Sequence, residues 1–253
     1  MGMSFEKKYP VNFYNIDSKF RCKVTSFFDF LGDVGMSQSE ELGVGIHNLL
    51  AKNLTWVFYK YNFKIFRYPE FGEDIRIKTT PTGFKKFYAY REYLIYDSEN
   101  NVIGEGKSLF FLIDINRRRP ARIPEEEYEA YGCKGDIEDS IPMNEPEKLI
   151  EPEYVKEFYI RHSDIDFNRH VNNSRYVEWA LEAVPEKITE EFSLEEIRIV
   201  FMREITYGHM VKTMCSVQEQ ESGKIKVIHL IKDDEGSDIT ALTTIWKADK
   251  ASL

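Results

Sequence analysis

The chain of 253 residues has few cysteines and no long apolar run. Cys22, Cys133 and Cys215 are odd in number and lack Cys-x-x-Cys spacing, which argues against a disulfide framework and a structural zinc site. No apolar stretch approaches the roughly 18 residues that a membrane-spanning helix needs. The N-terminus, MGMSFEKKYP, also lacks the apolar core of a secretory signal. We therefore expect reduced thiols, no membrane insertion and a cytoplasmic location.

An excess of basic charge is also missing. The formal net charge of −9 at pH 7 argues against nucleic acid as a partner. A hydrophobic content of 42%, with 14% aromatic residues, is enough for a substantial core and predicts a globular protein. One local basic run, which comprises Arg117, Arg118, Arg119 and Arg122, stands out. This run is either a solvated loop or a surface that binds an acidic partner. A run of charges by itself is more often a solvated loop.

The two halves of the chain resemble each other at an offset of 136 residues, which indicates an internal duplication. Apolar residues alternate in 61–65 as they do in 197–201, and an arginine follows each stretch. The same offset pairs Arg67 with Arg203, Phe71 with Tyr207, Gly72 with Gly208, Ile75 with Val211, Cys22 with Phe158 and Val24 with Ile160.

Each half is predicted to contain a first strand, a helix and then several long strands joined by short turns. Short turns between consecutive strands indicate antiparallel sheets, each able to bury one helix, so the fold class is α+β. The segment 117–152 is rich in Pro, Glu and Gly and is interpreted as a linker between domains 1–116 and 153–253. The helices are expected at 37–52 and 173–183, and the strands at 55–66, 74–81, 87–97, 102–115, 197–204, 211–220, 224–232 and 239–247.

The segment from Ser163 to Pro185 carries the strongest chemical signal. In an extended strand, residues two apart point to the same side. Asp164, Asp166, Asn168 and His170 can therefore share one face if the strand extends that far. Asn172 and Asn173 are two candidate N-caps for the helix that follows, and the free amides at its N-terminus favour negative charge.

A histidine with a carboxylate can hold and deprotonate a water molecule, which suffices to hydrolyse an activated ester. In this interpretation Asn168 orients the water or stabilises the oxyanion, and no metal is needed. Asp164 is as well explained by a turn as by catalysis. A nucleophile is not evident, because there is no Gly-x-Ser-x-Gly motif and Cys215 is best read as a small buried residue.

The duplication makes this chemistry asymmetric. At an offset of 136, apolar, small or aromatic residues take the positions of the polar set. We therefore expect the first half to shape a binding pocket and the second half to carry the reaction. The predicted counterparts of Asp166, Asn168, His170 and Glu204 are Phe30, Gly32, Val34 and Tyr68, respectively.

The whole chain, roughly residues 5 to 247, resembles the acyl-ACP thioesterases, which release fatty acids from acyl carrier protein. The resemblance rests on the run DFNRHVNN at 166–173, followed by Tyr176, Trp179, Leu181, Glu182 and Val184-Pro185, and on NLTWV at 53–57, Arg67-Tyr68-Pro69 and Gly72. It implies a double hot-dog fold with two tandem modules, each an antiparallel sheet wrapped around a long helix, and no cofactor. It also implies Asp166, Asn168, His170 and Glu204 as functional residues.

The resemblance also implies a mechanism and a substrate. Many plant members have a cysteine after the glutamate, whereas this chain has Ile205, so direct attack by water activated by Glu204 and His170 is favoured. The implied partner is acyl carrier protein carrying a phosphopantetheine-linked acyl chain, and Arg117, Arg118 and Arg119, with Lys85 and Lys86, are candidates for docking it. Trp56, Phe58, Phe63 and Phe87 are candidates for an acyl pocket, although such residues are more often plain core.

Three alternatives stay open at this point. An acyl-CoA thioesterase on the same fold would recognise a nucleotide, and a non-catalytic acyl sensor would bind without turnover. A hot-dog dehydratase would need an acid/base partner that the first half does not supply. The sequence sets neither the acyl length nor the choice between monomer and homodimer.

Overall fold

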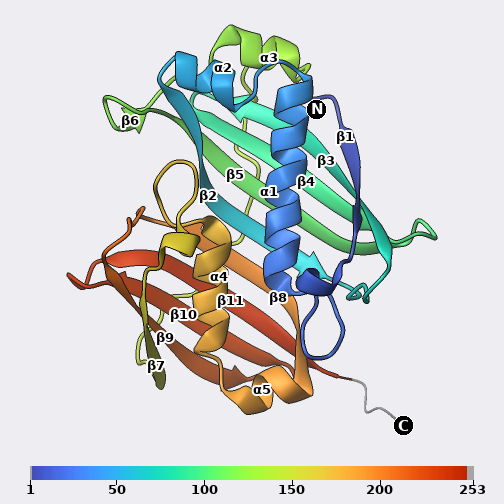
Figure 1. Cartoon of the computed structure of the whole chain (residues 1–253), viewed down its shortest axis with the longest axis vertical. Helices are drawn as coiled ribbons and strands as arrows, with labels where there is room; N and C mark the ends of the chain where they lie inside the picture. Colours follow the sequence, from blue (N-terminus) through green and yellow to red (C-terminus); the bar gives the residue numbers. More distant parts are fainter. Residues whose placement is uncertain (1, 250–253) are drawn as a thin grey trace. The chain divides into compact units, whose positions relative to one another are not determined.

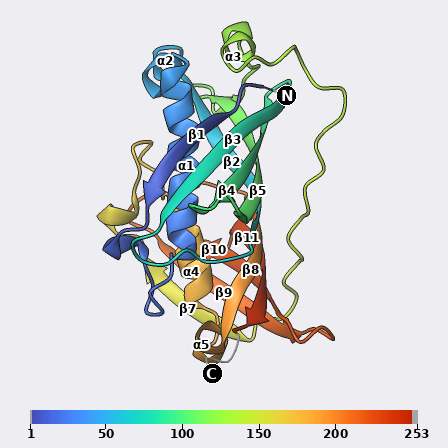
Figure 2. The same cartoon turned by 90° about the vertical axis from the view of Figure 1, so that its right-hand side faces the viewer.

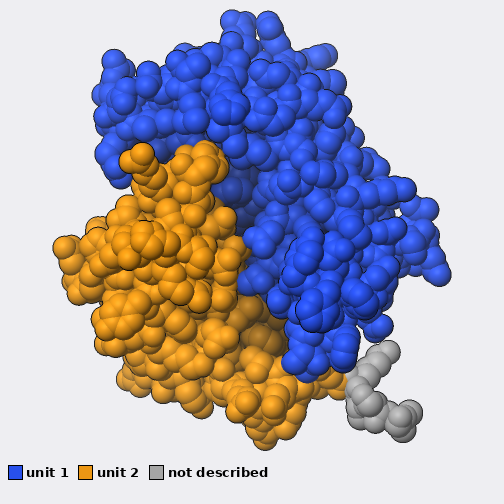
Figure 3. All heavy atoms as spheres, in the orientation of Figure 1, with its two compact units in different colours: residues 1–143 blue, residues 144–253 orange. Residues whose placement is uncertain are grey.

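The structure is a computed structural model that describes residues 2–249. The chain forms two compact units that divide between Met143 and Asn144 (Figure 3). Strand β6 (Arg119–Pro120) and helix α3 (Glu125–Ala130) lie within the stretch that composition indicates as a linker. None of the helices within the described range has the length and apolar character that a membrane crossing requires.

Unit 1 contains an antiparallel sheet with the strand order β1-β3-β4-β5-β2, and β6 pairs with β5. The predicted strands are all present. Strand β3 continues four residues past its predicted end, because a register shift between Pro81 and Gly83 accommodates the proline within the ladder. The bounds are β1 (Phe5–Pro10), β2 (Leu54–Ile65), β3 (Asp74–Lys85), β4 (Tyr88–Tyr96) and β5 (Val102–Asp114).

Helix α1 (Val24–Glu41) runs along one face of this sheet (Figures 1 and 2). It buries Phe27, Phe28, Leu31 and Val34 at helical spacing. The predicted helix at 37–52 is wrong, because α1 ends at Glu41 and a separate short helix, α2 (Ile46–Ala51), follows. Gly43, with φ +74°, allows the break. Burial against the sheet outweighs the low helix propensity of the aromatic segment that begins α1.

Unit 2 repeats this plan with the strand order β8-β11-β10-β9-β7, and all neighbours are antiparallel. Helix α4 (Asn173–Glu182) packs its buried residues, including Tyr176 and Trp179, against the sheet, as the sequence predicts. Each unit is thus a sheet with a long helix on one face, which is the hot-dog arrangement. The remaining bounds are β7 (Tyr154–Tyr159), α5 (Glu186–Glu191), β8 (Phe192–Phe201), β9 (Met210–Glu219), β10 (Ile225–Asp233) and β11 (Asp238–Ala248).

Candidate active site

The segment between β7 and α4 forms a tight turn rather than the predicted strand. The Asp166 carboxylate accepts hydrogen bonds through Oδ1 from the backbone N–H groups of Asn168, at 2.8 Å, and His170, at 3.3 Å. The Asp166 N–H donates to the His170 carbonyl at 2.8 Å. A short aspartate side chain that bonds the amides just after it competes with strand pairing, which explains the departure from an extended chain.

Asp164 does not share the face of His170. It is fully buried in a 3₁₀ turn (His162–Asp164), where Oδ2 accepts from the Arg161 backbone N–H at 2.8 Å. The Arg161 guanidinium also donates to Oδ1 at 3.1 Å, and Arg175 Nε lies 3.8 Å from the same oxygen. Of the two roles considered for Asp164, turn formation and catalysis, the structure supports turn formation.

Asn172 is the N-cap of α4, one of the two candidates in the sequence. Its side-chain oxygen accepts from the Ser174 N–H and lies 3.0 Å from it, and its own N–H donates to the Asp164 carbonyl. The capped helix therefore holds the end of the loop in place.

The structure brings His170 and Glu204 together. His170 Nε2 lies 3.3 Å from Glu204 Oε2, and the two side chains are 26% and 34% exposed, so both reach solvent. Glu204 lies just beyond β8, which ends at Phe201 instead of reaching Glu204 as predicted. The Val171 N–H donates to the Ile205 carbonyl at 2.9 Å, and this bond places the Glu204 segment beside the loop of His170.

Two aromatic residues that the sequence did not indicate as site residues support the Glu204 segment. The hydroxyl of the buried Tyr176 bonds to the backbone of Ile205, and burial raises its pKa well above the ordinary value, so it stays protonated. The ring of Tyr207 stacks on that of His162 with centroids 3.8 Å apart. In the sequence, the apolar face predicted for the helix at 173–183 is the feature that could have indicated Tyr176.

Asn168 is the fourth member of the predicted set. Its backbone N–H is bound to Asp166, while its side-chain amide makes no hydrogen bond with any residue in the range 2–249. The amide is half-buried and remains able to donate to, or accept from, a ligand.

Unit 1 contains the same loop before helix α1, at an offset of 149 residues. The Asp17 carboxylate accepts from the N–H groups of Lys19, at 2.8 Å, and Arg21, at 3.0 Å. The Asp17 N–H donates to the Arg21 carbonyl at 2.8 Å. Phe20 and Arg169, at matching positions, both have positive φ, 59° and 65°. The backbone of the loop is therefore duplicated.

This geometry corrects the predicted correspondence. Asp17, Lys19 and Arg21 match the polar set, and Phe30, Gly32 and Val34 do not. The early pairs of Cys22 with Phe158 and Val24 with Ile160 are wrong for the same reason. The segment with α1 and α2 is longer than the segment with α4 and α5, so the offset is 149 before the helices and 136 after them.

After the helices the offset of 136 holds. The N–H groups of Arg67 and Arg203 both donate to the carbonyl of an isoleucine at matching positions, at 3.2 Å in each unit. Tyr68 therefore is the counterpart of Glu204. In unit 1 the Arg21 guanidinium lies 4.9 Å from the Tyr68 ring centroid, where unit 2 has the His170–Glu204 pair. Unit 1 keeps the loop and lacks the imidazole–carboxylate pair.

The aromatic residues predicted for an acyl pocket lie on or near β2 and β4 in unit 1. Trp56 and Phe58 contact Phe84 and Phe110, with ring centroids 6.2 and 4.3 Å apart. Phe63 is fully buried under α1 and belongs to the core. Phe87 contacts Tyr88, with centroids 4.5 Å apart. The structure thus groups these residues in more than one cluster.

The predicted docking arginines lie at the turn between β5 and β6. Arg117, Arg118 and Arg119 are all exposed. Arg117 Nε lies 3.7 Å from Asp114 Oδ2, and Arg118 has a positive φ of 50°. The run is therefore a solvated turn of unit 1, and its role in docking stays a prediction.

The cysteines are all unbonded to one another. Cys22 and Cys215 are fully buried, and burial raises the pKa of each thiol to about 12. A thiol with such a pKa is a poor nucleophile at neutral pH. Within residues 2–249, no group of three or more His, Cys, Asp or Glu side chains could hold a metal ion.

The two hot-dog units define a double hot-dog protein, and unit 2 contains the His170–Glu204 pair. The model of the acyl-ACP thioesterase N-terminal domain matches residues 2–131, and that of the C-terminal domain matches residues 147–248. The chain therefore belongs to the acyl-ACP thioesterase family.

Known proteins resemble this chain over nearly its whole length. It is 24% identical over 275 aligned residues to the chloroplastic palmitoyl-acyl carrier protein thioesterase of Gossypium hirsutum, covering 99% of this chain and 65% of the relative. A Lactobacillus plantarum structure assigned as an oleoyl thioesterase has a TM-score of 0.94 and 22% identity, with 98% of each chain covered. The 12:0-ACP thioesterase of Umbellularia californica has a TM-score of 0.86 and 20% identity, with 97% of this chain and 94% of that chain covered. These structural likenesses show the fold.

Proposed function

We propose that the protein hydrolyses the thioester of fatty acyl-acyl carrier protein to a free fatty acid and holo-carrier protein, ending fatty acid synthesis. The observation that carries this proposal is the His170–Glu204 pair, 3.3 Å apart and open to solvent in unit 2. Family membership supplies the substrate class. An acyl sensor has no need of such a pair, so the pair favours turnover over binding alone.

In the proposed reaction, a water molecule gives a proton to the His170–Glu204 pair while its oxygen attacks the thioester carbonyl carbon. The Asn168 amide donates a hydrogen bond to the developing oxyanion or orients the water. The C–S bond then breaks, and the proton passes to the sulfur of the leaving pantetheine arm. Asp166 acts through the backbone by holding Asn168 and His170 in the turn.

The test is the release of free fatty acid from a panel of acyl-carrier proteins of different chain lengths. The wild type is measured beside His170→Ala and Glu204→Ala. Turnover by the wild type with a loss of about 10²- to 10⁴-fold in each variant supports the proposal. Full activity in both variants would place the site elsewhere, and tight binding without turnover would indicate a sensor. Acyl-CoA with matched chains, assayed in parallel, separates the two carriers.

We propose that the exposed arginine run of unit 1 contributes to docking of the acidic carrier. Reversing the charge of Arg117, Arg118 and Arg119 is expected to raise KM for acyl-carrier protein by about 10-fold, because opposite charges steer association. A small thioester without the carrier is the control substrate. Equal effects on both substrates would contradict docking by this run.

The acyl pocket predicted with Trp56, Phe58 and Phe87 also stays a proposal, and the chain-length panel tests it with alanine variants of these three residues. Phe63 is left out because it belongs to the core. The cytoplasmic location is likewise a prediction, which cell fractionation tests. Light scattering separates a monomer from a homodimer.

A further inference from the structure

Two arginines flank the proposed catalytic pair in unit 2. Arg169 directly precedes His170, and Arg203 directly precedes Glu204. Both side chains are exposed. Among residues 2–249, neither guanidinium takes part in a hydrogen bond, an ion pair or a cation–π contact. The bond between the Val171 N–H and the Ile205 carbonyl sets the two backbone segments side by side.

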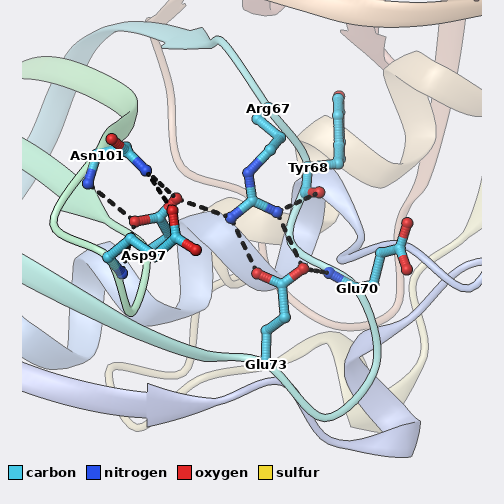
Figure 4. A network of polar contacts seen from close by, with 7 residues as sticks. Arg67, Tyr68, Glu70, Glu73, Asp97 and Asn101 are labelled. Carbon is cyan, nitrogen blue, oxygen red and sulfur yellow. Dashed lines mark hydrogen bonds and ion pairs between the residues drawn. The ribbon is translucent and has the colours of Figure 1, made fainter.

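In unit 1, Arg67 occupies the position that matches Arg203, and there the arginine has a structural role. Arg67 donates to both carboxylate oxygens of Glu73 at 2.9 Å and to Asp97 Oδ2 at 3.2 Å (Figure 4). This network raises the pKa of Arg67, chiefly through the hydrogen bonds to Glu73, and lowers that of Glu73. Arg67 thus ties the strand end to the β4–β5 turn that Asp97 and Asn101 form.

Unit 2 keeps the same backbone but has lost the partners of the arginine. His209 stands at the position of Glu73 and is turned to Asp234, with Nδ1 3.0 Å from Oδ2. Asp233 stands at the position of Asp97 and still accepts from the N–H groups of its turn, at 2.7 and 3.1 Å. Arg203 is bonded to neither residue. The change that leaves Arg203 without an ion pair therefore lies next to Glu204 of the proposed catalytic pair.

Arg169 is unusual for its backbone. Its φ of +65° is a conformation that costs most side chains about 1 kcal/mol and that glycine or asparagine adopts more easily. Its counterpart Phe20 carries no charge. The loop therefore does not require a cation at this position, and the charge is specific to the unit with the catalytic pair.

We propose that Arg169 and Arg203 form an anion-binding rim that holds the carrier end of the substrate, either the phosphate of the phosphopantetheine arm or carboxylates of the carrier. This inference rests on the proposed function. Two exposed guanidinium groups suit phosphate or carboxylate, which accept paired N–H donors. The rim binds the end of the substrate that is far from the thioester and so orients the thioester. Removing the rim is therefore expected to raise KM more than it lowers kcat.

The test uses three substrates with the same acyl group: acyl-pantetheine, which carries no phosphate, acyl-4′-phosphopantetheine and acyl-carrier protein. Arg169→Gln combined with Arg203→Gln is expected to raise KM for acyl-carrier protein by about 10-fold and to leave acyl-pantetheine unchanged. A matching rise for acyl-4′-phosphopantetheine identifies the phosphate as the ligand. A rise for acyl-carrier protein alone identifies carrier carboxylates.

Two variants serve as controls. Lys187→Gln removes one exposed positive charge from α5 in unit 2 and is expected to leave all three KM values unchanged. Arg67→Gln breaks the matching network in unit 1 and is expected to lower thermal stability without altering the preference among substrates. The preference of the wild type for acyl-carrier protein is expected to weaken with added salt, and that of the double variant to respond less.

The rim is overturned if the double variant keeps the wild-type KM for acyl-carrier protein, or if KM rises equally for acyl-pantetheine. This outcome differs from a failure of the proposed function, which would appear as a wild type that turns over none of the three substrates. In that case, binding of holo-carrier protein to wild type and double variant decides: equal affinities overturn the rim, and weaker binding by the variant supports it.

Discussion

At the scale of single residues, the site depends on side chains that bond to backbone. Within residues 2–249, Asp166 makes no hydrogen bond or ion pair with the His170 ring, and its Oδ1 instead accepts from two amides of the loop. Asp164 fixes the preceding turn in the same manner. The sequence indicated Asp166 as a functional residue implied by the family resemblance, and the structure shows that its carboxylate binds the backbone of the loop. The sequence could not place Asp164, because alternation along a strand does not apply to a turn.

We predict that Asp166→Ala lowers kcat by about 10- to 100-fold, since it removes two hydrogen bonds to a charged acceptor. Asp166→Asn retains an oxygen acceptor and is expected to lose much less. Steady-state hydrolysis of acyl-carrier protein gives both values. If asparagine were as harmful as alanine, the carboxylate would have a role in proton transfer instead.

A second residue-scale prediction concerns Glu127 in α3. Its side chain is fully buried, and neither carboxylate oxygen has a hydrogen-bond partner within residues 2–249. Burial, with a smaller contribution from Glu126, raises the pKa of Glu127 to about 7. The folded protein therefore holds this proton more tightly than the unfolded chain, and stability falls as pH rises from the ordinary carboxyl pKa through about 7.

Glu127→Gln is accordingly expected to raise the free energy of unfolding at pH 8 by up to about 3 kcal/mol, and to have little effect at pH 5. Urea unfolding at the two pH values measures this difference. Glu129→Gln is the control, because Glu129 is an exposed carboxylate of the same helix and, unlike Glu126, does not contribute to the raised pKa of Glu127. An equal effect of Glu127→Gln at both pH values would show that its carboxylate is not the titrating group.

At the scale of secondary-structure elements, strands were easier to predict than helices. Alternating apolar residues placed all eight long strands, since period two is evident even in short segments. Helix α4 was found from its asparagine cap. Helix α1 was not, because its aromatic residues and glycines have low helix propensity, although Phe27, Leu31 and Val34 are spaced for one buried face.

The glycines of α1 give a prediction at this scale. A Cβ added at Gly32 would meet no heavy atom within 4 Å. Gly32→Ala is therefore expected to stabilise the protein by about 0.5–1 kcal/mol, because alanine loses less backbone entropy on forming a helix. Chemical denaturation measures the gain. In Gly83→Ala the new Cβ would lie 2.4 Å from Ile137 Cγ2, so that variant should lose stability. A loss in Gly32→Ala would contradict the open environment of α1.

At the scale of the whole molecule, the sequence shows the duplication, but the offset of 136 aligns only part of one copy with the other. The offset of 136 is correct for Tyr68 and the strands that follow it, and wrong for the loop before the helices. A single offset cannot describe two copies whose helical segments differ in length. The duplicated loop was recognised only from its hydrogen bonds, because its side chains share little besides Asp17 and Asp166.

We predict that catalysis belongs entirely to unit 2. Arg21→Gln and Tyr68→Phe are expected to keep kcat within about 2-fold of the wild type, whereas His170→Gln is expected to lose most turnover. The reason is that Arg21 and Tyr68 stand where unit 2 has an imidazole and a carboxylate, so unit 1 lacks that pair. Arg21→Gln removes the cation–π contact with Tyr68 and should lower the free energy of unfolding by about 0.5–1 kcal/mol, which thermal unfolding detects. A collapse of kcat in Arg21→Gln, with folding intact, would contradict this division of labour.

The aspartate-held turn also bears on how new activities arise. Its bonds use amide hydrogens, which every residue except proline possesses, so the positions corresponding to His170 are free to change without loss of the loop. The two copies in this chain already differ in this way, since one presents an arginine and the other an imidazole. The same tolerance makes residues 168–170 a favourable place for directed evolution, where different acids, bases or nucleophiles can be tried on an unchanged scaffold.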